Sequence, residues 1–289
     1  MPTNEQRREA AKRKLDRQLA RRAKRAKRRR TFAVLGSVAG VLLVVGVVVG
    51  ISLLGNGEQS SVDPEPSALP LPTSEPLTIP TAIAPPPVRP EPLTAPVDCQ
   101  YPPSPPPATA VKPVTPPPGG SVPIQGTQQV TLQTSEGPVE LTLDRALAPC
   151  TVHSFLSLAQ QGFYNDSPCH RLVTNPGLQV LQCGDPTGQG NGGPGYTIPD
   201  EVFPELTYGR GYVAMANSGQ PNSGGSQFFL IYGDAQLPPD YTVFATIPPA
   251  GLEIIDEIAR AGDDGSLEPS PGGGKPNKPV TITSVDIAA

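Results

Sequence analysis

The chain has 289 residues, which is enough for one or two domains. It contains 40 prolines, and 22 of them lie between Pro64 and Pro123, in a stretch that cannot pack into a core of its own. The formal net charge of −4 hides a basic beginning, because residues 1–31 hold 14 Lys or Arg against three acids. This composition excludes one compact domain spanning the whole chain and leaves residues 124–289 as the globular candidate.

Residues 32–54, which follow the basic arm of residues 1–31, are 23 apolar or small residues without a charge. A stretch of this length crosses a bilayer as a helix, so we expect a transmembrane helix here. A cleaved signal peptide is the alternative, but it has a shorter apolar core and needs a small-residue cleavage site, for which we see no convincing candidate. The Lys/Arg excess predicts a cytoplasmic N-terminus, and therefore a single-pass cell-membrane protein whose remaining residues lie outside the cytoplasm.

The basic arm has clusters that suit either nucleic acid or anionic lipid headgroups. Because the arm adjoins a membrane segment, we favour lipid contact and expect no nucleic-acid partner. Residues 55–123 are polar and rich in proline, which predicts a disordered, extended, polyproline-like linker that holds the globular part away from the membrane. A docking function of its PxxP segments is the alternative.

Four cysteines follow the apolar segment: Cys99, Cys150, Cys169 and Cys183. An even number of cysteines in an oxidising compartment favours disulfide bonds, and four cysteines allow three pairings. A metal site is not expected, since the chain has only two histidines and no closely spaced pair of cysteines.

The globular candidate begins with strand signals. Residues 130–143 alternate apolar and polar side chains around the turn SEGP, which predicts a β-hairpin. Residues 150–161 predict a helix, with a proline near its start and a glycine past its end. Residues 252–261 predict a second helix with one apolar face, and residues 280–287 predict a final strand. Many short strands with two helices indicate a closed barrel capped at its ends.

The common catalytic devices are missing. The chain has no P-loop and no GxSxG nucleophile motif. Cys150 and His153 are spaced like a thiol–imidazole pair, although a disulfide cysteine beside a surface histidine is the simpler interpretation. His170 is a candidate general base, but it has no evident nucleophile in the sequence.

Two segments combine an apolar strand with long polar side chains, CHRLVTNPGLQVLQCGD (residues 169–185) and MANSGQPNSGGSQFFLIYG (residues 215–233). In the first, Arg171 and Gln182 flank a turn, so both side chains can reach one face. In the second, Gln227 and Phe229 are two residues apart and share a face of a strand. Such a surface, with amide and guanidinium groups beside an aromatic ring, suits the binding of a peptide main chain and one apolar ring.

The motifs HRL, LQCGDP, MANSG, GSQFF and YTVFATI occur in this order, and together they resemble the signature of the cyclophilin family of peptidyl-prolyl cis-trans isomerases. The resemblance covers residues 128–287. It implies a mainly β fold, a closed eight-stranded antiparallel barrel capped by two helices. It also implies a groove on the outer surface that binds an X–Pro segment, without a cofactor or metal.

Matched position by position, the resemblance implies that Arg171 is the catalytic arginine and that Gln182 holds the substrate backbone. The implied substrate-binding residues are Val180, Gln179, Ala216, Asn217, Gln227, Phe229, Leu237 and Tyr241. The chain departs from the family pattern by three extra residues between Arg171 and Gln182. The usual pocket phenylalanine therefore falls on Gln179, or on Leu178 if the register slips by one. Gln236 replaces a tryptophan that some relatives use to bind cyclosporin, so weak inhibition is expected.

The resulting expectation is an isomerase in residues 124–289 that acts on proline-containing peptides or unfolded exported proteins. A proline-peptide binding module or chaperone with little turnover is the alternative, and an envelope scaffold is the third interpretation. Cys169 and Cys183 flank the predicted antiparallel hairpin of this region, which favours a bond between them and leaves Cys99 to pair with Cys150.

Overall fold

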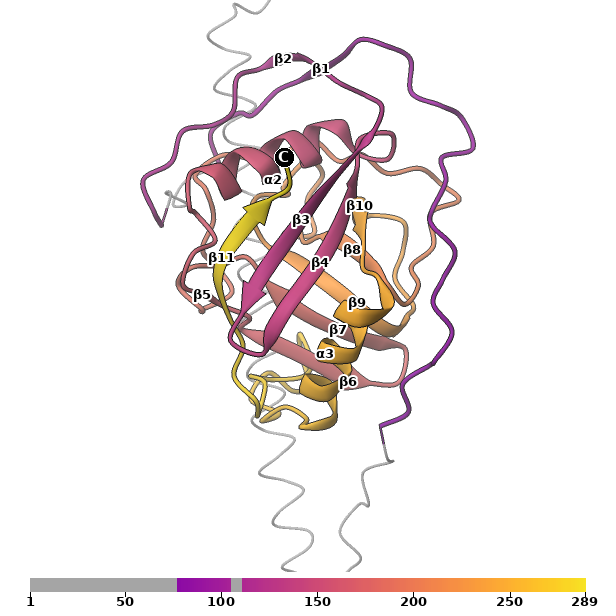
Figure 1. Cartoon of the computed structure of the whole chain (residues 1–289), viewed down its shortest axis with the longest axis vertical. Coiled ribbons are helices and arrows are strands. Elements are labelled where there is room, and N and C mark those ends of the chain that lie inside the picture. Colours follow the sequence, from indigo (N-terminus) through magenta and orange to yellow (C-terminus); the bar gives the residue numbers. More distant parts are fainter. Residues whose placement is uncertain (1–76, 105–110) are drawn as a thin grey trace, which may run out of the picture. The chain divides into compact units, whose positions relative to one another are not determined.

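The computed structural model describes residues 77–104 and 111–289 (Figure 1). None of the helices formed by these residues is long and apolar enough to cross a membrane. The predicted basic arm, the predicted transmembrane helix and the first part of the predicted linker, residues 55–76, lie outside the described residues.

The predicted hairpin is confirmed by strands β3 (Thr127–Thr134) and β4 (Gly137–Asp144), which pair in antiparallel register. Alternate apolar side chains, among them Leu132 and Leu141, are buried on one face, as the period of two requires. The turn ends at Gly137, whose φ of 129° is in the region that favours glycine.

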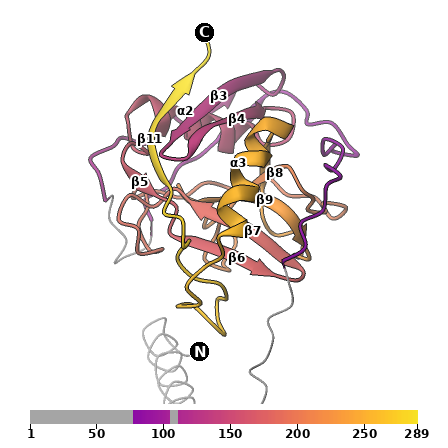
Figure 2. The same cartoon turned by 60° about the horizontal axis from the view of Figure 1, so that its bottom comes forward.

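Both predicted helices are present, as α2 (Pro149–Gln160) and α3 (Pro249–Arg260). Each has a proline in its first turn, where the missing N–H leaves no hydrogen bond unmade. Helix α3 begins three residues before the predicted start, because Pro249 opens it. The two helices lie near opposite ends of β4 (Figures 1 and 2). Gly251 of α3 lies against Val139 near the start of β4, whereas α2 follows the end of β4 in the chain.

Seven further strands of the described chain join β3 and β4. They are β5 (Ser167–Pro168), β6 (Arg171–Asn175), β7 (Leu178–Cys183), β8 (Tyr212–Met215), β9 (Phe228–Ala235), β10 (Val243–Thr246) and β11 (Thr281–Ile287). With β3 and β4 they form one antiparallel sheet in the order β5-β11-β3-β4-β10-β8-β9-β7-β6.

This sheet differs from the predicted closed barrel of eight strands. It is a curled sheet of nine strands with β5 and β6 at its two edges. Strand β5 has only two residues and pairs with β11, but not with β6 at the other edge. The gap is crossed instead by an isolated bridge, in which Leu172 N donates to Gly274 O at 2.8 Å and Gly274 N donates to Leu172 O at 3.0 Å. Through this bridge, the loop that precedes β11 pairs with β6 and connects the two edges of the curled sheet.

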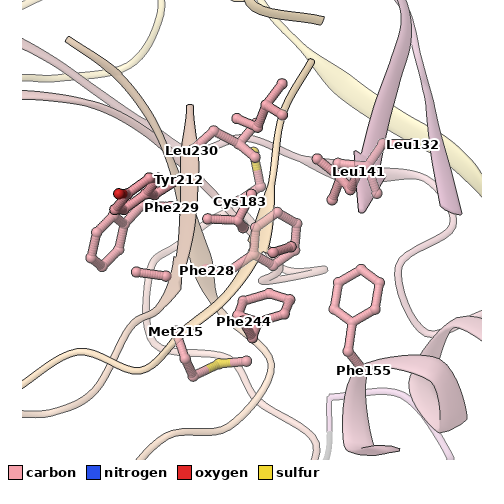
Figure 3. Close-up of a cluster of buried hydrophobic side chains, with 14 of the residues drawn as sticks. Leu132, Leu141, Phe155, Cys183, Tyr212, Met215, Phe228, Phe229, Leu230 and Phe244 are labelled. Atoms are coloured by element: carbon pink, nitrogen blue, oxygen red, sulfur yellow. The ribbon is translucent and has the colours of Figure 1, made fainter. Parts of the chain in front are cut away.

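The core beneath α2 is aromatic. The rings of Phe155, Phe228 and Phe244 lie within 6.4 Å of one another, measured between centroids. Figure 3 shows Phe228 on the same side of β9 as Phe155, and Phe229 on the other side. The alternation along β9 thus separates a core residue from a residue of the outer face.

The proline-rich stretch from Leu77 onward is not a free linker, which corrects the domain boundary predicted at residue 124. Strands β1 (Val97–Cys99) and β2 (Gly120–Val122) form a two-stranded sheet, and Cys99 is disulfide-bonded to Cys150 of α2. Upstream of them, Ala84 N donates to Arg210 O at 3.0 Å. A proline-rich segment can pack in this way because its prolines, although they lack N–H groups, still have carbonyl acceptors and apolar rings that can contact the domain.

Candidate active site

Three neighbouring strands bring both predicted catalytic residues and one predicted substrate-binding residue into one row. Arg171 of β6 is opposite Gln182 of β7, and Gln182 is opposite Phe229 of β9. Directly opposite residues of adjacent strands present their side chains on the same face of a sheet. The register therefore places a guanidinium, an amide and an aromatic ring side by side on the outer face.

These residues line a groove of about 630 Å³. Eight of the ten predicted site residues contribute to its lining: Arg171, Val180, Gln182, Ala216, Asn217, Phe229, Leu237 and Tyr241. Phe229 is only 6% exposed, and Tyr241 packs edge-on against it with the ring centroids 5.5 Å apart. Among the described residues, no group of three His, Cys, Asp or Glu side chains is placed to hold a metal ion.

Gln179 does not line the groove, contrary to the first of the two registers considered for the pocket position. Its side chain is buried elsewhere, where Nε2 donates to Thr78 O at 2.9 Å and Oε1 accepts from Asp234 N at 2.9 Å. Leu178, the alternative position, lines the groove. The reason is the alternation of side chains along β7, which puts Leu178, Val180 and Gln182 on the groove face and Gln179 on the opposite face.

Gln227 also lies outside the lining of the groove, but it is hydrogen-bonded to Gln182, which is part of the row. Arg171 Nη1 donates to Gln182 Oε1 at 3.1 Å, and Gln182 Nε2 donates to Gln227 Oε1 at 2.9 Å. Gln227 Nε2 in turn donates to Gly192 O at 3.0 Å. Because an arginine can only donate, it fixes the orientation of the first amide, and that amide fixes the second. We call these four residues the amide relay.

Two main-chain carbonyls hold the rest of the guanidinium. Arg171 Nε donates to Gly272 O at 2.9 Å and Nη2 donates to Pro271 O at 2.6 Å. Partial burial lowers the pKa of Arg171, while Tyr241 and Glu268 act in the opposite direction. An arginine nevertheless stays protonated at any physiological pH. With three of its five N–H groups engaged in these described contacts, one N–H on each terminal nitrogen is left for a ligand.

A disulfide bond closes the row at one end. Cys169 and Cys183, which adjoin the strand segments of Arg171 and Gln182, are bonded, with their Cα atoms 4.0 Å apart. Both cysteines are buried. Together with the bond between Cys99 and Cys150, the structure has the two predicted pairings.

The order of these motifs matches a known family. A family model described as "Cyclophilin type peptidyl-prolyl cis-trans isomerase/CLD" matches residues 129–287, more than half of the chain. The chain belongs to the cyclophilin family. The resemblance on which the site prediction was based is therefore confirmed.

Two mycobacterial relatives agree with this assignment. The chain is 44% identical to the probable peptidyl-prolyl cis-trans isomerase B of Mycobacterium leprae, over 99% of this chain and 100% of that protein. It is 50% identical to the protein of the same name from Mycobacterium tuberculosis, over 57% of this chain and only 56% of that protein. Among solved structures, a cyclophilin-type isomerase of Cryptosporidium parvum is 31% identical, covers 57% of this chain and 99% of its own, and has a TM-score of 0.49.

The groove of this cyclophilin also contains residues that the sequence analysis did not assign to the site. His170 lines it, and burial lowers the pKa of this histidine, as does the charge of Arg171, against an opposing effect of Asp185. In the sequence it stood out only as a candidate general base, next to Arg171 in the motif HRL. The imidazole is therefore neutral at pH 7 and adds no second charge to the groove.

The loop between α3 and β11 forms another unpredicted wall of the groove, through Ser266, Leu267, Pro271 and Lys275. The sequence of this segment is rich in glycine and proline, which predicts a loop but does not indicate where in the fold the loop lies. The fold places it beside Arg171, because Gly274 pairs with Leu172.

Proposed function

We propose that the chain is a peptidyl-prolyl cis-trans isomerase that accelerates rotation of X–Pro bonds in exported or envelope proteins. The observation that carries the proposal is the row of Arg171, Gln182 and Phe229 in one groove. Membership of the cyclophilin family supports it. The expected ligands are proline-containing peptides and unfolded chains.

Rotation about a peptide bond has a barrier of about 18–20 kcal/mol, because the nitrogen lone pair is delocalised into the carbonyl. For X–Pro the two planar isomers are close in energy, so the obstacle is kinetic. Catalysis therefore needs no covalent step. It needs a site that binds the twisted amide more tightly than either planar form.

In the twisted amide the proline nitrogen becomes pyramidal and regains its lone pair as an acceptor. The N–H groups of Arg171 that remain available would donate to this nitrogen, and the guanidinium would do so without losing its charge. Phe229, Leu237 and Val180 would bury the proline ring on the apolar side of the groove. Donors already held in place in a partly dry groove contribute more than the same donors in water.

Gln182 would hold the substrate backbone on one side of the ring, and the Ala216–Asn217 segment on the other. The side chain of Asn217 donates to Asp240 O at 2.8 Å and accepts from Gly219 N at 2.9 Å, which fixes the loop around it. A fixed loop gives the peptide chain a defined path across the groove.

We propose further that the domain lies outside the cytoplasm, anchored by residues 32–54 in the cell membrane with the basic arm inside. The 23 uncharged residues and the preceding excess of Lys and Arg support this topology. Two disulfide bonds are typical of an oxidising compartment, which agrees with it.

The test is cis/trans exchange of a short Ala–Pro peptide, measured by NMR with the full-length chain and with Arg171→Ala. Loss of one hydrogen bond from a charged donor in the transition state costs about 1.5–3 kcal/mol, so turnover should fall roughly 10- to 150-fold. Arg145→Ala, which removes an arginine outside the groove, is the matched control and should leave turnover unchanged. An Arg171→Ala variant as active as the wild type would remove this mechanism.

One observation favours a second candidate function, a proline-peptide binding module or chaperone with little turnover. Leu178, one of the two positions to which the family's pocket phenylalanine was assigned, lines the groove, so this wall is aliphatic and not aromatic. The same experiment separates the two functions. A peptide whose resonances shift on binding, while its exchange rate stays at the uncatalysed value, would identify a binding module.

A further inference from the structure

The loop between α3 and β11 reaches Arg171 through its main chain, with no carboxylate in direct contact. The carbonyls of Pro271 and Gly272 accept from two nitrogens of the guanidinium, at 2.6 Å and 2.9 Å. Among the ion pairs of the described residues, none includes Arg171. The direction of this side chain therefore depends on where the loop places two carbonyl groups.

Two sets of contacts hold these carbonyls in place. Glu268 Oε1 accepts from Gly273 N at 2.7 Å and from Asn175 Nδ2 at 2.8 Å, which ties the loop to the end of β6. The paired hydrogen bonds between Leu172 and Gly274 attach the loop to β6 one residue after Gly273.

Gly273 permits this close approach. Its φ is 74°, and a Cβ atom there would lie 2.1 Å from Leu172 O. The loop main chain is thus pressed against the strand that carries Arg171, and no other residue type fits at this position without a shift of the backbone.

We propose that Glu268 is a positioning residue for the isomerase reaction, whose carboxylate fixes residues 271–273 so that their carbonyls aim the guanidinium of Arg171 into the groove. The inference rests on the proposed function, in which Arg171 donates to the twisted amide. Glu268 itself is exposed and touches neither the groove nor the guanidinium, so it acts through the loop.

An indirect arrangement has a chemical advantage. A carboxylate bonded directly to Arg171 would compete with the substrate for the guanidinium and offset its charge. Neutral carbonyls orient the same N–H groups and leave the charge available. The hydrogen bond from Gly273 N, followed by that from Asn175, lowers the pKa of Glu268, which agrees with an ionised carboxylate at neutral pH.

The experiment compares the full-length wild type with Glu268→Ala, Glu268→Gln, Glu253→Ala and Arg171→Ala. Exchange of an Ala–Pro peptide gives kcat and KM, and the 15Nε–1Hε resonance of Arg171 reports its hydrogen bond to Gly272. Removing the acceptor should lower kcat about three- to tenfold with KM unchanged, a part of what a hydrogen bond to a charged group contributes. Glu268→Gln keeps an acceptor oxygen and should retain kcat within about twofold of the wild type. Glu253→Ala removes an exposed acid of α3 and should change nothing.

The resonance gives a readout that a general loss of stability would not move. In the wild type, solvent exchange of the Arg171 Nε–H should be slower than that of Arg145, and in Glu268→Ala it should become as fast. If Glu268→Ala does not fold, the wild-type measurement still decides, because an unprotected Arg171 Nε–H overturns the proposal.

Three other outcomes would also overturn it. The first is an unchanged kcat in Glu268→Ala. The second is an increased kcat/KM in Glu268→Ala, which would show that the loop between α3 and β11 competes with substrate. The third is a Glu268→Gln variant as impaired as Glu268→Ala. Each differs from failure of the proposed function itself. In that case Arg171→Ala would retain the turnover of the wild type, whatever the Glu268 variants did.

Discussion

Gln227 lies outside the groove, yet the amide relay connects it to Arg171. Gln227→Ala removes the acceptor for Gln182 Nε2, at 2.9 Å, and the donor for Gly192 O, at 3.0 Å. A neutral hydrogen bond contributes about 0.5–1.5 kcal/mol net, so the two losses should lower the free energy of unfolding by roughly 1–3 kcal/mol. The groups are only partly buried and regain water, which favours the lower end of that range.

The effect on turnover should come through Gln182 alone. Without Gln227, the amide of Gln182 is held from one side only, by Arg171, and its oxygen is less firmly fixed beside the guanidinium. If this costs about 1 kcal/mol in the transition state, kcat/KM should fall roughly fivefold. NMR exchange on an Ala–Pro peptide measures the rate, and urea unfolding measures the free energy of unfolding.

A double-mutant cycle of Gln227→Ala with Gln182→Ala tests the reasoning directly. If Gln227 acts through Gln182, the double variant should turn over at the rate of Gln182→Ala, with a coupling energy of about 1 kcal/mol. Gln129→Ala, on β3, is the control, because its side chain contacts Thr142 and not the relay. Additive effects of Gln182→Ala and Gln227→Ala would refute the relay.

Two further predictions concern stability. The carboxylate of Glu201 accepts three hydrogen bonds at the N-terminus of α2, at 2.7–2.9 Å. Glu201→Ala should therefore lower the free energy of unfolding by about 2–4 kcal/mol, and Glu201→Gln should lower it less. Equal losses in urea unfolding would contradict this prediction. Burial lowers the pKa of His170 from 6.5, so the folded state binds fewer protons there than the unfolded state does. The free energy of unfolding should therefore decline as the pH falls below 6.5, relative to a His170→Gln variant, and a constant difference between pH 8 and pH 5 would show that this pKa is not lowered.

Local patterns in the sequence predicted the elements that carry the site. The alternation of residues 130–143 was sufficient for the hairpin, and apolar periodicity was sufficient for both helices, because each signal comes from neighbouring residues. Arg171 and Phe229, each predicted from an apolar strand with polar neighbours, line the same groove, and their functions in it stay a prediction. Gln179 lies on the opposite face because side chains alternate along β7, so that it cannot share the groove face with Val180 and Gln182.

Contacts between distant residues were beyond such reasoning. Helix α2 has no capping side chain of its own, and its N-terminal N–H groups are bound by Glu201, about 50 positions away. The proline-rich residues from Leu77 onward read as a linker, because nothing in their composition records that Gln179 binds Thr78 across 101 positions.

The sequence by itself determined the order of charge, apolar segment and motifs, the family, and the residue types available for chemistry. Only the tertiary structure decided that Arg171 is oriented by carbonyls from the loop before β11 and that Gln182 is held between Arg171 and Gln227. The physical reason is that local propensity and periodicity act between near neighbours in the chain. The direction of a buried polar side chain is set by whichever donors and acceptors the completed fold places around it.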